Sequence, residues 1–71
     1  TLNNLGSVYR NLGQYQQAID LYEQSLAIMQ AIGARQNEGA VLVGLGSAYL
    51  SLGQYQRAID FFEQSLAIVQ E

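Results

Sequence analysis

The chain has 71 residues, a mass of 7.8 kDa, a net charge of −3 and an apolar content of 49%, which suffices for one small domain. It contains neither Cys nor His, so the usual zinc, haem and iron-sulfur ligand sets, disulfides and Cys- or His-based catalysis are excluded, and we expect no metal, cofactor or catalytic residue. The cations are three scattered arginines, so we expect no nucleic-acid partner. The apolar runs are short, so we expect no membrane-spanning segment.

Apolar residues at helical spacing predict a first helix from residue 1 to residue 12 and a second from residue 15 to residue 32. A glycine follows each helix, Gly13 and Gly33, and can close the last turn in the left-handed conformation. The second helix has a wide apolar face, so we expect it to pack between two other helices. That face consists of Tyr15, Ala18, Ile19, Tyr22, Leu26 and Met29, with Leu21 and Ile28 beside them.

The same pattern predicts a third helix from Gln36 to Leu52, followed by Gly53, and a fourth from Tyr55 to Gln70, which we expect, like the second, to pack between two other helices. Ala34 stands where a capping Asp, Ser or Asn is expected before the third helix, so a start near Asn37 is the alternative. Proline and alternating apolar runs are absent. The sequence therefore predicts an all-α fold of four helices, arranged as antiparallel helix hairpins.

An internal repeat relates the two hairpins. Residues 5–30 align without gaps with residues 45–70 at an offset of 40, and 19 of the 26 aligned residues are identical. Such a period is typical of a helical solenoid, in which each unit buries its apolar face against its neighbours. We expect one domain over residues 1–71, with repeat one at 1–32 and repeat two at 36–71, and we expect it to be part of a longer array.

The repeat resembles the tetratricopeptide repeat in its leucine-glycine pair, tyrosine, alanine and later aromatic residue. The residues that carry the resemblance are Leu5, Gly6, Tyr9, Ala18, Tyr22 and Leu26, and then Leu45, Gly46, Tyr49, Ala58, Phe62 and Leu66. Glycine inside a helix is unfavourable by about 1 kcal/mol relative to alanine, so Gly6 and Gly46 predict close helix approach, with Ala18 and Ala58 as the facing small side chains.

Two features distinguish these repeats within the family. Serines stand where a small alanine is usual, at Ser25 and Ser65, and Gln30 and Gln70 stand where many members have a proline. The spacing of 40 residues resembles the longer subclass of kinesin light chains and Pins-type scaffolds, and the Gln-rich, nearly identical units resemble bacterial arrays.

The resemblance implies that a peptide or protein partner binds a concave groove lined by the first helix of each hairpin. The matching positions are Asn3, Ser7, Arg10, Asn11, Val43, Ser47, Leu50 and Ser51. Without lysine in this set, we do not expect the clamp that holds the carboxylates of chaperone C-termini. Arg10 could pair with a partner carboxylate, and Val43 and Leu50 could form an apolar strip. The alternative is that this face is ordinary solvated surface.

A second interpretation is a structural role, in which uncapped ends of nearly identical units associate with other copies. Catalysis is not expected, because the recurring acids Asp20, Glu23, Asp60 and Glu63 read as a solvated helix face and the serines lack a base. The five tyrosines, Tyr55 among them, are predicted to lie in the core. A cytoplasmic location is expected.

Overall fold

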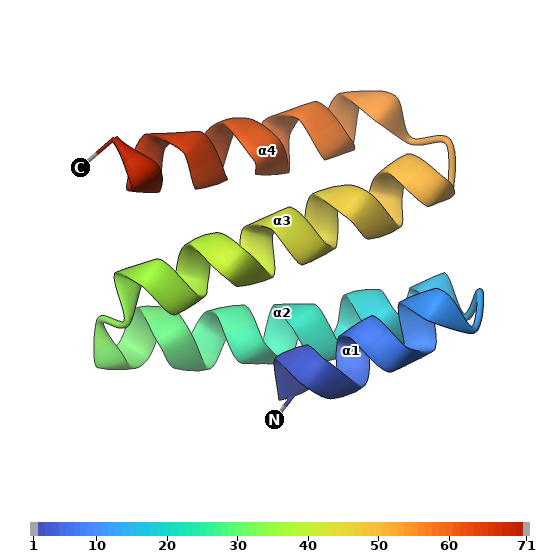
Figure 1. Ribbon diagram of the computed structural model, residues 1–71, viewed down its shortest axis with the longest axis horizontal. Coiled ribbons are helices and arrows are strands. Elements are labelled where there is room, and N and C mark those ends of the chain that lie inside the picture. The colour runs from blue at the N-terminus through green and yellow to red at the C-terminus, as the bar shows by residue number, and fades with distance from the viewer. Residues whose placement is uncertain (1, 71) are drawn as a thin grey trace.

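The computed structural model describes residues 2–70, with side chains described for residues 4–70. Four helices follow one another along the chain, and the described residues contain no strand (Figure 1). The all-α prediction is therefore confirmed. The helices are α1 (Leu2–Asn11), α2 (Tyr15–Ile32), α3 (Arg35–Ser51) and α4 (Tyr55–Val69).

The helix boundaries lie within one residue of the predicted ones wherever the structure describes them. The third helix begins at Arg35, so the alternative start near Asn37 is wrong. Ala34 provides no side-chain cap, and its carbonyl oxygen accepts the amide of Glu38 at 2.9 Å, which is the first hydrogen bond of the helix. The predicted first residue, Thr1, lies outside the described residues.

Each tight turn between helices is closed by a glycine in the left-handed conformation, as the sequence predicts. Gly13, Gly33 and Gly53 have φ angles of 79°, 72° and 78°. After α1, the amide of Gln14 donates to the carbonyl of Tyr9 at 2.9 Å and that of Gly13 to Arg10 at 3.0 Å. This is the Schellman arrangement, which satisfies helix-terminal carbonyls, and the other two turns repeat it. The hairpins are therefore tight and antiparallel.

The packing order is a staggered stack rather than a four-helix bundle. α2 packs against both α1 and α3, and α4 packs against α3 alone (Figure 1). α1 and α3 also touch each other. The molecule is a slab of 31 × 25 × 14 Å, and each helix packs mainly against the helices before and after it in the chain. The expectation that each second helix lies between two others is correct for α2 and wrong for α4, because no helix among residues 2–70 covers the far side of α4.

The core is centred on Tyr22, which is fully buried in α2. A Cβ atom added at Gly6 of α1 would lie 3.0 Å from its ring, and one added at Gly44 of α3 would lie 2.7 Å from it. A Cβ atom added at Gly46 would likewise lie 2.7 Å from the ring of Phe62. The predicted close approaches exist, and the atoms nearest to each glycine belong to an aromatic ring.

The outer face of α4 departs from the predicted core. Tyr55 is exposed, so its assignment to the core was wrong. Other apolar residues of the same face are exposed as well, although their copies in α2 are buried or half-buried: Ile59, Leu66 and Val69. The reason is positional, because α3 covers this face of α2 and nothing in the described residues covers it on α4.

Candidate functional site

The exposed side of α3 carries the predicted groove residues of repeat two. α3 is buried against α2 on one side and against α4 on another, which leaves a third side open. On it, Val43, Leu50 and Ser51 are exposed and Ser47 is half-buried. Ala40, which the sequence analysis did not single out, is also exposed, and its spacing from Val43 and Ser47 extends the same face by one turn.

The corresponding residues of α1 are placed less uniformly. The side chain of Asn3 lies outside the described ones. Asn11 is exposed and Arg10 is half-buried. The hydroxyl groups of Ser7 and Tyr22 are 3.0 Å apart and share a hydrogen bond, so Ser7 takes part in holding α1 against α2. Among the predicted residues of α1 whose side chains are described, Asn11 is the exposed one.

A cleft of about 610 Å³ lies where α3 begins and α4 ends. Val43 is the one predicted groove residue on its wall. The other lining residues are Arg35, Gln36, Gly39, Ala40, Ser65, Ile68 and Val69. At its base the Ser65 hydroxyl donates to the carbonyl oxygen of Gly39 at 3.1 Å. The buried serine that distinguishes this repeat thus links α4 to α3, because its hydroxyl needs a partner once it is removed from water.

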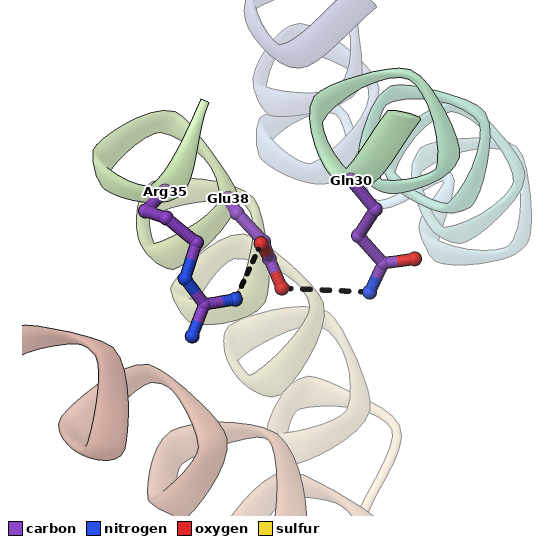
Figure 2. A network of polar contacts seen from close by, with 3 residues as sticks. All are labelled: Gln30, Arg35 and Glu38. Carbon is purple, nitrogen blue, oxygen red and sulfur yellow. Dashed lines mark hydrogen bonds and ion pairs between the residues drawn. The ribbon is translucent and has the colours of Figure 1, made fainter. Parts of the chain in front are cut away.

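A buried carboxylate links α2 to α3, and the sequence analysis missed it. The carboxylate of Glu38 accepts from the Arg35 guanidinium at 2.9 Å and from the side-chain amide of Gln30 at 3.4 Å (Figure 2). The Glu38 side chain is only 8% exposed. A signal was present, since Glu38 lies three and seven residues before the apolar Val41 and Leu45, on the buried side of the helix.

The other four carboxylates of the described residues lie on the surface. Asp20, Glu23, Asp60 and Glu63 are all exposed. Asp20 and Asp60 each accept a hydrogen bond from the glutamine four residues earlier, at 3.3 and 3.4 Å. In the part of the chain that the structure describes, no three His, Cys, Asp or Glu side chains gather as metal ligands, and no helix has the length and apolar character needed to cross a bilayer.

The chain matches the model of a known repeat family along the given sequence. The family model described as "Tetratricopeptide repeat" matches residues 1–71. Comparison with curated proteins gives no match, and comparison with solved structures gives none either. The family assignment agrees with the antiparallel hairpins, the glycine-closed turns and the packing of α2 between two first helices. This chain belongs to the tetratricopeptide repeat family.

Proposed function

We propose that this chain binds a peptide or a partner protein along the open side of α3, with α1 extending the surface. The family is a non-catalytic module that binds protein partners. The observation that carries the choice of surface is that Val43 and Leu50 stay exposed on α3, the most buried helix of the chain. Large apolar side chains gathered on one exposed face mark a contact surface more often than isolated ones do.

The chemistry of this surface suits a partner segment that is largely apolar and carries a carboxylate. Val43 and Leu50 are two helical turns apart, about 10 Å along the axis, which matches successive apolar residues of a bound helix or extended segment. Ser47 lies between them and can hydrogen-bond to a partner backbone. On α1, Arg10 supplies a cation for a carboxylate of the partner.

The repeat length and composition support a proposal about the subclass of the family to which the chain belongs. The 40-residue offset supports membership of the longer subclass that includes kinesin light chains and Pins-type scaffolds, and the Gln-rich, nearly identical units support a bacterial scaffold. A cytoplasmic location is part of the same proposal.

Selection of peptides from a displayed library on the intact chain tests the choice of surface. Val43→Asp and Leu50→Asp should each lower the affinity for the selected peptides at least tenfold, because a charge is then buried against an apolar partner. Ala67→Asp, a change at an exposed residue of α4, is the control and should leave affinity unchanged. Selected peptides that bind all three variants equally would overturn the proposal.

A second candidate, association between copies, is favoured by the apolar residues exposed at both edges of the stack. Leu5 and Val8 are exposed on α1, Leu12 in the turn after it, and Ile59, Leu66 and Val69 on α4. Sedimentation velocity over a range of concentrations tests it. Association predicts a dimer that Ile59→Asp or Leu5→Asp weakens, whereas a monomer at millimolar concentration contradicts it.

A further inference from the structure

The two hairpins join where α2 is followed by α3, and the connection between these helices is very short. Only Gly33 and Ala34 separate them, and the amide of Ala34 donates to the carbonyl oxygen of Met29 at 3.0 Å. This turn lies at one end of the slab, and the turns within the two hairpins lie at the other (Figure 1). A change of angle at the junction would therefore displace the far ends of α1 and α3 the most.

Two kinds of contact hold α3 against α2. Around Tyr22 and Gly44 the contact is apolar and tight, and apolar attraction has no preferred direction. Glu38 lies six residues before Gly44, about 9 Å nearer the junction along α3. There its carboxylate accepts a hydrogen bond from the Gln30 side chain of α2, and hydrogen bonds are directional (Figure 2). The apolar contact supplies attraction, and the polar contact restricts the angle.

Both carboxylate oxygens of Glu38 have a partner. Oε1 accepts from the Arg35 guanidinium at 2.9 Å, and Oε2 accepts from the exposed Gln30 amide at 3.4 Å. Glu38 also lies in the first turn of α3, where the helix dipole favours a negative charge. A buried carboxylate is unfavourable without such partners. A movement that withdraws Gln30 from Glu38 therefore raises the free energy of the protein.

We propose that the buried charge of Glu38 acts as a clasp that fixes the angle between the two hairpins. Arg35 belongs to the same helix and holds the carboxylate in place, whereas Gln30 belongs to the other hairpin and is held by it. Without the clasp, the apolar core still joins the hairpins, but they can pivot about the contact between Tyr22 and Gly44. Buried polar groups fix the register of packed helices in a similar way in coiled coils.

The alternative is that the apolar core alone fixes the angle, and Gln30→Glu distinguishes the two. The new side chain has nearly the same shape as the old one, but an ionised carboxylate cannot donate a hydrogen bond to Glu38 and is repelled by it. The polar contact across the junction is therefore lost, whether the new side chain stays in place or turns towards solvent. The core residues are unchanged.

A distance measurement between the far ends of α1 and α3 tests the clasp. The chain has no cysteine, so spin labels can be attached at Asn11→Cys and Ser51→Cys, two exposed positions on these helices. Double electron–electron resonance then gives the distribution of distances between the labels. We expect one narrow distribution in the parent chain, and Gln30→Glu should roughly double its width because the hairpins can then pivot.

Two further variants make the test specific. Gln56→Glu is the matched control, because Gln56 donates to Asp60 at the same 3.4 Å on the exposed surface of a single helix. Water and salt screen the added charge there, so the distribution should stay unchanged. Gln30→Glu combined with Glu38→Gln exchanges the donor and the acceptor of the pair and should restore the narrow distribution. Circular dichroism checks that each variant is folded.

Three results would overturn the inference. An unchanged distribution in Gln30→Glu would show that the core fixes the angle alone, and equal broadening by Gln56→Glu would show that any added charge has this effect. If Gln30→Glu unfolds the chain, the combined variant decides, since a folded chain with a narrow distribution supports the clasp and a failure to restore it contradicts the clasp. No outcome involves a partner, so failure of the function proposed for α3 is distinguishable from failure here.

Discussion

The helices α2 and α4 are near-copies in sequence and differ in how they are buried. Both carry the segments Ala-Ile-Asp and Glu-Gln-Ser-Leu-Ala-Ile at the same positions of the repeat. Ile19 of α2 is 2% exposed, whereas Ile59 of α4 is 48% exposed. The difference arises because α3 covers α2 and no described helix covers the outer side of α4. In this fold the next helix, and not the residue itself, decides whether an apolar side chain belongs to the core.

The first helices show the same effect in the opposite direction. Leu45 of α3 is fully buried, and its copy Leu5 of α1 is 44% exposed. α3 has a second helix before it, α2, which covers Leu45, whereas α1 has no such neighbour among the described residues. The centre of the molecule, α2 with α3, therefore accounts for most of the core. We expect a mutation to lower the free energy of unfolding more when it lies between these two helices than when it lies at an edge.

The largest expected effect comes from the two aromatic residues that the repeat places at equivalent positions. Tyr22→Ala should lower the free energy of unfolding by about 3–5 kcal/mol, a large part of the stability of so small a domain. Phe62→Ala should lower it by about half as much or less, because Phe62 keeps contact with α3 only. Urea denaturation followed by circular dichroism measures both. Equal losses would break the comparison between the two helices.

Two glycines of α3 should respond to alanine with opposite signs. Gly44→Ala forces a methyl group into the Tyr22 ring and should destabilise the chain by about 1–3 kcal/mol. Gly39→Ala meets Ile68 at an ordinary 3.6 Å and gains helix propensity, so it should stabilise by about 0.5–1 kcal/mol. Thermal unfolding of the two variants in parallel measures the difference. A stabilising Gly44→Ala would contradict the packing described for Tyr22.

The smallest expected effect concerns the two equivalent glutamines near the ends of α2 and α4, Gln30 and Gln70. Gln30→Ala removes a partner of the buried Glu38 and should lower stability by about 0.5–1.5 kcal/mol. Gln70→Ala should change it by less than about 0.5 kcal/mol, because Gln70 is exposed beside an uncovered face. Chemical denaturation at a fixed salt concentration checks the pair. A larger loss for Gln70→Ala would show that its side chain has a structural role of its own.

The sequence predicted helix number, type and boundaries well, because apolar spacing and the glycines at 13, 33 and 53 are local signals. It could not assign burial to individual copies, since the periodicity of Tyr55 and Ile59 is the same whether or not another helix covers them. The role of Gly44 also escaped it, because only the packed structure brings this residue against Tyr22. At the candidate site, the predicted exposure of Val43 and Leu50 is confirmed, and their binding role stays a prediction.

The same substitution made at the two equivalent isoleucines tests the central claim most directly, because side chain, helix and repeat position are all held constant. The measurement is the free energy of unfolding of Ile19→Ala and of Ile59→Ala from urea denaturation under one set of conditions. The account predicts a loss of about 2–5 kcal/mol for Ile19→Ala and of less than about 1 kcal/mol for Ile59→Ala. Losses of equal size would contradict it, because the covering helix would then not be what decides burial.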